Sequence, residues 1–409
     1  MHSHSICRAM APRFLFILFF LAAVCYQSEC ATGKRLGKFI KHFEPLYYDT
    51  ASLHKIHRRA VESRAHAKFS FSAFGKFHQL NLRPDREIFT REATIVSSDG
   101  KPIPFDRDAV VRGKVEGHPS SDVYGVIDKD DGFHGKILSG SENYYVDPSS
   151  WYFDKRQDFP SVIYKDTDLE YDHNFADLHQ RVPSVQVPER TRRSLADQDQ
   201  GRVRRQTSEE LGRDACTLGL YADNFYTKLY GGKTKAIFQL VKQVQAAQII
   251  YTNEFNESDY FSDKGLTFRV KTIVVFNETG KPPSNLPAQV TDSNVGIDTL
   301  LDLFSSIDHS DVCEAFLFTD RDFEGGILGL AWIGDPDGAA AGGICDKFVD
   351  YGGGKKRSYN TGVVTMKLYG RFTPPRISEI TFAHELGHGF GSQVSFCFGV
   401  FCNVYKNTL

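Results

Sequence analysis

Two histidines near the end of the sequence, His384 and His388, stand four positions apart, and Glu385 directly follows the first. On a helix these positions lie one turn apart on the same face, so two neutral imidazoles can bind one Zn²⁺ at about 2.0–2.1 Å. Glu385 can take a proton from the attacking water and later give it to a leaving amine. The spacing predicts a hydrolytic zinc centre. A structural histidine pair is the alternative, because a five-residue pattern also arises by chance.

The two histidines need a helix, and the sequence predicts one from about Arg376, directly after two prolines. Phe382, Leu386 and Phe390 repeat every four residues on the opposite face and can bury against a sheet. Upstream, predicted strands alternate with predicted helices. The strands are 217–223, 266–276, 313–320, 328–334 and 362–368, and the helices are 236–252 and 296–307. This alternation predicts an α/β domain with one mostly parallel sheet.

The region before this domain has a different pattern. Short segments of alternating polar and apolar residues, separated by turn signals such as Ser-Asp-Gly, occupy 68–82, 122–127, 143–148 and 161–166. They predict a β-rich domain.

The N-terminus predicts a secretory signal. Arg8 and Arg13 precede an apolar run at 14–25, and small residues follow it, so we expect cleavage near residue 30. The run is shorter than the roughly 20 residues of a membrane span, and a buried core helix is the alternative. We therefore expect the chain in the secretory pathway, secreted as written and without a membrane span. The formal net charge of −2 gives no reason to expect nucleic acid as a partner.

A polar linker at 181–205 carries two Arg-x-Arg-Arg motifs, which end at Arg193 and Arg205. Both fit the acidic cleft of furin-like convertases, and a solvated basic run or nucleic-acid patch is the alternative. The expected organisation is a signal peptide (1–30), a propeptide (31–205), an incomplete catalytic domain (206–392) and an unrelated tail (393–409). In this compartment Asn256 and Asn277, each in an Asn-x-Ser/Thr sequon, are candidate glycosylation sites.

Several long motifs resemble the Kuzbanian-type ADAM metalloproteases, the Notch-shedding, α-secretase type. They are "HFEPLYYDTASLHKIHRRA", "LFTDRDFEGGILGLAWIG", "GGICDK", "YNTGVVT" and "YGRFTPPRISEITFAHELGHGFGS". The resemblance implies a metzincin-like fold, a five-stranded mixed sheet with the zinc helix below it and a β-rich propeptide domain in front. It also implies that Notch- and amyloid-precursor-like stalks are the substrates. They would pair with an edge strand formed by Gly329, Leu330, Ala331 and Trp332. By the same resemblance Cys216 and Cys313 form a disulfide.

The chain departs from this family at the third zinc ligand, where Val394 stands in place of histidine. A catalytic zinc needs three protein ligands. Losing one of four ligands in a site worth about 10–16 kcal/mol costs on the order of 3–4 kcal/mol. Gln393 is a poor substitute, and Cys397 lies three residues beyond the needed position. The propeptide also has no cysteine in 32–205 that could inhibit the zinc.

The resemblance stops after Ser392. Residues 393–395 can be encoded by a splice-donor sequence, so we expect the tail to be translated intron; a diverged terminus is the alternative. The function predicted is zinc-dependent endopeptidase cleavage of membrane-protein stalks. The second hypothesis is a catalytically inactive secreted fragment, which is inhibitory or a gene-model artefact.

Overall fold

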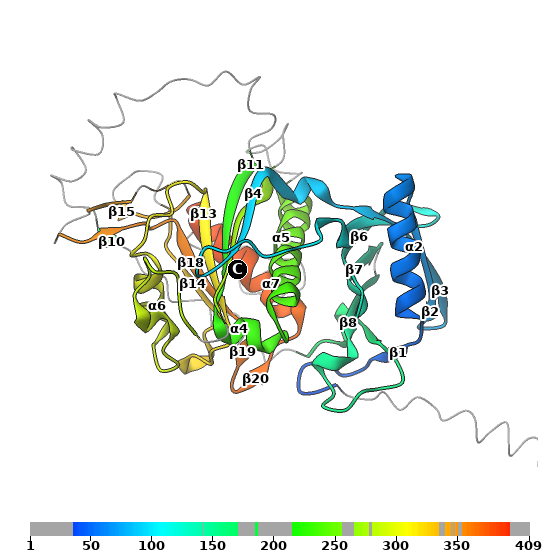
Figure 1. The fold of residues 1–409 in the computed structure, drawn as a ribbon. Coiled ribbons are helices and arrows are strands. Elements are labelled where there is room, and N and C mark those ends of the chain that lie inside the picture. Colours follow the sequence, from blue (N-terminus) through cyan, green and yellow to red (C-terminus); the bar gives the residue numbers. More distant parts are fainter. Residues whose placement is uncertain are drawn as a thin grey trace, which may run out of the picture.

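The computed structural model describes residues 36–140, 142–170, 185–186, 215–255, 266–277, 280–334, 340–344, 346, 348–350 and 354–392. The predictions for the signal peptide, Arg193, Arg205, Asn256 and the tail with Val394 lie outside these residues. Two sheets lie side by side, with helices α5 (Lys233–Phe255) and α7 (Pro375–Gly389) between them (Figure 1). None of the helices in the described ranges is long and apolar enough to cross a membrane.

The N-terminal domain (residues 36–170) is built on an antiparallel eight-stranded sheet in the order β1-β9-β8-β7-β6-β5-β3-β2. The strands are β1 (Glu44–Leu46), β2 (Ala67–Ala73), β3 (Lys76–Pro84), β5 (Val110–Val115), β6 (His118–Asp128), β7 (Gly132–Ser139), β8 (Glu142–Pro148) and β9 (Ser161–Lys165). Residues alternate between buried and exposed along β2, as expected for a sheet with one covered face. The prediction of a β-rich region is confirmed.

Helix α2 (Thr50–Ser63) covers this sheet, and the sequence patterns did not predict it. Its N-terminus is capped by the Asp49 carboxylate, which accepts a hydrogen bond from the Ala51 amide. Leu53 and Ala60 pack into the same apolar cluster as Phe69. The helix ends at Arg64, which takes the left-handed conformation with φ 54°.

The C-terminal domain (residues 215–392) contains a six-stranded sheet in the order β14-β18-β13-β11-β12-β4. The strands are β4 (Phe89–Ser97), β11 (Ala215–Ala222), β12 (Thr267–Val275), β13 (Glu314–Thr319), β14 (Gly329–Ala331) and β18 (Thr361–Thr365). All neighbours pair in parallel except β14 and β18. The predicted mixed α/β fold is confirmed. Five of these strands belong to the C-terminal domain, and the sixth, β4, comes from the N-terminal domain.

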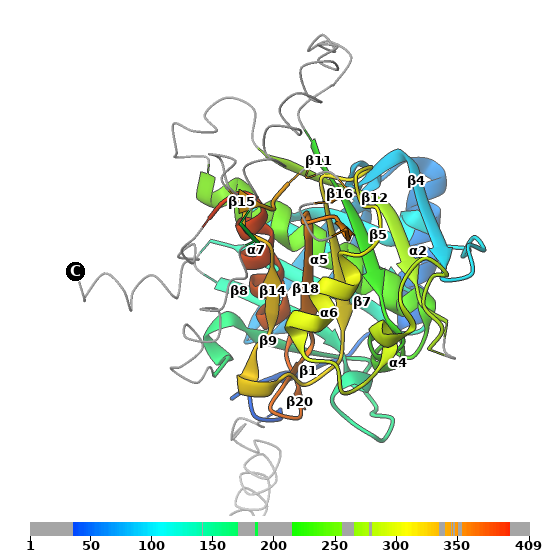
Figure 2. The same cartoon turned by 90° about the vertical axis from the view of Figure 1, so that its left-hand side faces the viewer.

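Helices cover both faces of this sheet. Alternate residues of β13 point to opposite faces of the sheet. Phe316 and Phe318 face the apolar cluster that contains α5 and α7. Ala315 and Leu317 face the cluster that contains α6 (Ile297–Phe304). Figure 2 shows α6 in front of the sheet and α7 next to β14. Small two-stranded pairs lie at the periphery: β10 (Val185–Gln186) with β15 (Ala340–Ala341), β16 (Val349–Asp350) with β17 (Lys356–Arg357), and β19 (Lys367–Leu368) with β20 (Arg371–Phe372).

A buried ion pair holds the ends of the central strands together. The Nη1 atom of Arg321, after β13, lies 2.6 Å from Oδ2 of Asp223, after β11. Asp223 also accepts a hydrogen bond from the amide of Tyr226 and so caps α4 (Asn224–Leu229). Arg321 donates a further hydrogen bond to the Val290 carbonyl at 2.6 Å. The pair therefore ties two strands, a helix and a loop.

We predict that Arg321→Met lowers the free energy of unfolding by about 3–5 kcal/mol, because the Asp223 carboxylate stays buried without its partner. Arg86→Met is the matched control. The Arg86 side chain is 67% exposed in its pair with Asp108, so its loss costs about 0–1 kcal/mol. Chemical denaturation of both variants measures the difference, and equal effects would contradict the role given to the buried pair.

Candidate metal centre and substrate edge

Helix α7 is buried along its length except at Arg376, which is partly exposed. Pro375 occupies its first turn, where a missing N–H costs nothing. Phe382 contacts the rings of Phe316 and Phe318 at 4.9 and 5.4 Å between centroids. After Phe390 the chain turns at Gly391, whose φ of 86° suits glycine. The predicted apolar face of the helix therefore packs on the sheet, and its position is fixed.

The two histidines lie side by side on α7, with ring centroids 4.5 Å apart and planes nearly perpendicular. His388 Nδ1 donates a hydrogen bond to the Ser392 carbonyl at 2.6 Å. This bond fixes the tautomer and leaves Nε2 of His388 as a lone-pair donor, as in known metal sites. His384 and His388 are 6% and 4% exposed. The pair fits two positions of a zinc site.

Within the described part of the chain, no three His, Cys, Asp or Glu side chains come together as a metal site.

The edge strand β14 contains the predicted substrate residues Gly329, Leu330 and Ala331, and Trp332 follows it. One side of β14 pairs with β18. The carboxyl group of Glu385 lies directly against Gly329, since a Cβ there would be 2.4 Å from Glu385 Oε1. The structure thus places the predicted general base beside the predicted substrate strand. Trp332 Nε1 donates to Ser305 Oγ at 2.9 Å, so this end of the edge is anchored in the core.

A buried acid that sequence reasoning missed lies against the C-terminal end of α7, where Gly389 follows His388. Glu314 on β13 is fully buried, and a Cβ on Gly389 would be 2.5 Å from both of its carboxyl oxygens. Neither oxygen has a hydrogen-bond partner among the described residues. Burial raises the pKa of the Glu314 carboxyl well above its usual range, and the charge of Glu385 raises it further. The only sequence signal was a charged residue in an otherwise apolar strand.

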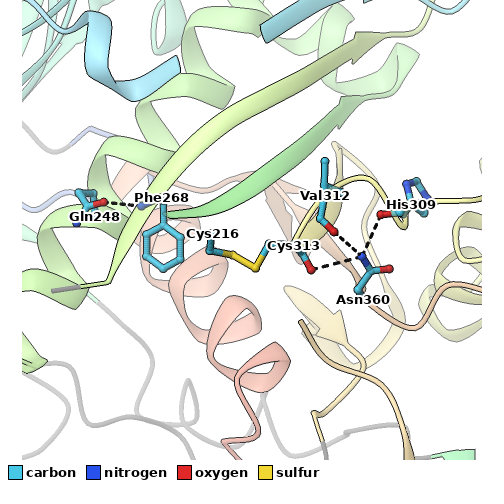
Figure 3. The surroundings of a disulfide bond; sticks show 7 residues. All are labelled: Cys216, Gln248, Phe268, His309, Val312, Cys313 and Asn360. Atoms are coloured by element: carbon cyan, nitrogen blue, oxygen red, sulfur yellow. Dashed lines mark hydrogen bonds between the residues drawn. A yellow bond between two sulfur atoms is a disulfide. The ribbon is translucent and has the colours of Figure 1, made fainter. Parts of the chain in front are cut away.

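A disulfide joins Cys216 on β11 to Cys313 just before β13, with Cα atoms 5.3 Å apart (Figure 3). Asn360 supports it by donating to the carbonyl oxygens of His309, Val312 and Cys313. The bond therefore fixes the start of β13, the strand on which α7 packs.

The candidate glycosylation site Asn277 follows β12 and is partly exposed. Its Oδ1 accepts a hydrogen bond from Lys233 Nζ at 2.9 Å.

We predict that Gly329→Ala lowers kcat/KM for a peptide substrate by ~100-fold, because the new Cβ displaces the Glu385 carboxyl or β14 by about 1 Å. Gly296→Ala is the control, since a Cβ there has no atom within 4 Å. Peptide hydrolysis by both variants, with circular dichroism to check folding, tests this. Unchanged kcat/KM in folded Gly329→Ala would rule out the proposed contact as a catalytic requirement.

Comparison with known proteins finds metallopeptidase relatives of this chain. Residues 233–397 match the family described as Metallo-peptidase family M12B Reprolysin-like. The chain is 34% identical over 383 residues to disintegrin and metalloproteinase domain-containing protein 10 of Homo sapiens. This alignment covers 88% of the chain and 50% of the human protein. The Bos taurus protein of that name is 33% identical over 381 residues, with the same coverage. The Caenorhabditis elegans homolog is 28% identical over 417 residues and is covered to 45%.

The chain spans about half the length of the curated relatives it matches. The family implies a metal cofactor, typically zinc, in agreement with the paired imidazoles on α7. The alignments extend over 88% of the chain, well beyond the matched peptidase region. The chain is therefore homologous to the ADAM-type metalloproteinases over 88% of its length, and residues 233–397 form a reprolysin-like metallopeptidase region.

Proposed function

We propose that the chain is the precursor of a zinc-dependent endopeptidase that cuts extended segments in the stalks of membrane proteins. The observation that carries this proposal is the position of Glu385, which lies on the same buried helix as His384 and His388 and against the edge strand β14. In this proposal, the ligands, the base and the substrate edge therefore lie close together.

The chain's own residues have three roles. His384 and His388 hold the metal, and the bond from His388 to the Ser392 carbonyl keeps the ligating nitrogen unprotonated. Zinc, when bound, polarises the scissile carbonyl and lowers the pKa of water. Glu385 accepts the proton of the attacking water and returns it to the leaving amine. The open backbone of β14 aligns an extended peptide by main-chain hydrogen bonds.

Stalk segments are the substrates that this edge favours. Strand addition recognises backbone and needs an unfolded, extended segment, which juxtamembrane stalks provide. The resemblance to the Kuzbanian type implies Notch- and amyloid-precursor-like proteins among them. A route through the secretory pathway, as the N-terminus predicts, would bring the enzyme to such substrates.

The N-terminal domain is the propeptide in this proposal, and a furin-like convertase separates it after Arg193 or Arg205. It contacts the protease close to the substrate edge. Phe39 packs with Leu328, directly before β14, and with Leu368 and Ile377. Since residues 32–205 contain no cysteine, inhibition rests on such contacts and not on a thiolate bound to zinc.

A second function is favoured by one specific residue. Val394 occupies the position of the third histidine ligand and carries no donor atom. A chain with a weak zinc site would act as a catalytically inactive secreted fragment, a propeptide with a partial protease domain.

We expect Glu385→Gln to abolish peptide hydrolysis, because an amide cannot accept the proton, while zinc binding is kept. Glu324→Gln is the control, since Glu324 is exposed on a short turn before β14. Hydrolysis of a stalk peptide and zinc content by mass spectrometry are measured for both variants. Residual turnover of Glu385→Gln comparable with the parent chain would show that another group is the base.

Processing is tested in the linker. Replacing Arg205 by Ala should leave the Arg193 site in use, and replacing both arginines should leave one uncut precursor. Denaturing gels of the secreted chain report the sizes. A mature-sized band from the double variant would mean that a different protease acts on the linker.

A further inference from the structure

Strand β4 belongs to the N-terminal domain by its position in the sequence, but it pairs with the sheet of the C-terminal domain. It lies between β3 and β5 in sequence, yet β3 and β5 pair directly with each other in the N-terminal sheet. Residues 89–97 instead form the outer strand of the C-terminal sheet, beside β12 (Figure 2). The eight strands of the N-terminal sheet therefore pair continuously without β4.

The pairing between β4 and β12 is a true parallel ladder. Thr94, Ile95, Val96 and Ser97 pair in order with the segment Thr272–Val275. The ladder continues past the strand end, where the Ser98 amide donates to the Val275 carbonyl at 2.9 Å. Backbone pairing of this kind is how an extended segment is recognised at a sheet edge.

The side chains of β4 are part of the protease core. Phe89, Ala93 and Ile95 are at most 8% exposed. They lie in the same apolar cluster as Phe268 and Val270 of β12 and as the apolar face of α5. Removing β4 would uncover this cluster and leave the edge of β12 without a partner in the described sheet, which is a state that proteins normally avoid.

We propose that the outer edge of β12 is a strand-binding site of the protease domain, and that its ligand is an extended segment adding in parallel. The segment Phe89–Ser97 occupies the site before linker cleavage and remains there afterwards as part of a separate chain. This inference rests on the proposed convertase processing, because only a cut chain has a separate propeptide.

Other contacts between the N-terminal and C-terminal domains, across the seam that β4 and β12 form part of, are also independent of the linker. The Gln245 amide donates to Asp85 at 2.8 Å, and Lys235 pairs with Asp131 at 2.5 Å. Lys242 Nζ lies 5.1 Å from the centre of the Trp151 ring. Every one of these partners lies before residue 171 or after residue 214, so cutting between 193 and 205 breaks none of them.

The test uses the full chain, cut in the linker by a purified convertase. Size-exclusion chromatography then follows the two fragments, and hydrogen exchange reports on the amides of Thr272–Val275. We expect the fragments to elute together and these amides to stay as protected as in the uncut chain. Early separation of the fragments, or loss of this protection while they elute together, would overturn the proposal.

A matched pair of variants isolates the strand. Ile95→Asp buries a charge in the seam and should raise the dissociation rate of the cut fragments by ~100-fold. Phe77→Asp makes the same type of change on the N-terminal domain, where the Phe77 side chain is 69% exposed, and should leave the rate unchanged. Equal rates for Ile95→Asp and the parent would overturn the assignment. If Ile95→Asp does not fold, the exchange measurement on the parent chain decides.

These measurements distinguish failure of the processing proposal from failure of the strand-binding proposal. If the convertase leaves the linker intact, the processing proposal fails, and a cleavage site for another protease placed at 190–193 allows the same dissociation test. Neither measurement needs catalytic activity, so an inactive zinc site does not affect the outcome.

Discussion

The burial of α7 between two sheets is the constraint on which the rest of the structure depends. On one side Phe382 and Leu386 pack against the central strands. On the other side Tyr145 of the N-terminal domain donates a hydrogen bond to Glu379 at 3.4 Å. Because the helix is held from both sides, its two imidazole rings keep a fixed position relative to each other. Such fixed geometry matters, because a zinc site tolerates only small deviations in ligand position.

The close approach of α7 to the sheet requires residues without side chains. A Cβ at Gly329 on β14 would meet the Glu385 carboxyl at 2.4 Å, and one at Gly389 on α7 would meet Glu314 of β13 at 2.5 Å. The space saved at Gly389 is filled by the buried carboxyl group of Glu314, and the space at Gly329 by the carboxyl group of Glu385. The Cys216–Cys313 disulfide and the Arg321–Asp223 pair hold opposite ends of the central strands. The core thus positions the site through packing, and the active helix has little freedom of its own.

The helix that carries the histidines and the alternation of strands and helices were predictable, because both follow from local periodicity. The five strands of the C-terminal domain match the predicted segments closely. Strand β4 was not predictable in its place, since its partner lies about 180 residues later and no local pattern encodes long-range pairing. Helix α2 was missed because it carries only two buried apolar side chains, Leu53 and Ala60, among many polar ones. Contacts such as Glu385 against Gly329 depend on tertiary approach and cannot be read from spacing.

The zinc affinity of the site on α7 is the most direct measurement of its chemistry. Competition with a chromophoric chelator gives dissociation constants for the parent chain, for Val394→His, and for Val394→His combined with His384→Ala. We predict a weak site in the parent and binding several hundred-fold tighter in Val394→His, since one more ligand adds on the order of 3–4 kcal/mol. The combined variant should lose this gain. Equal affinity in all three proteins would contradict a zinc centre built on His384 and His388.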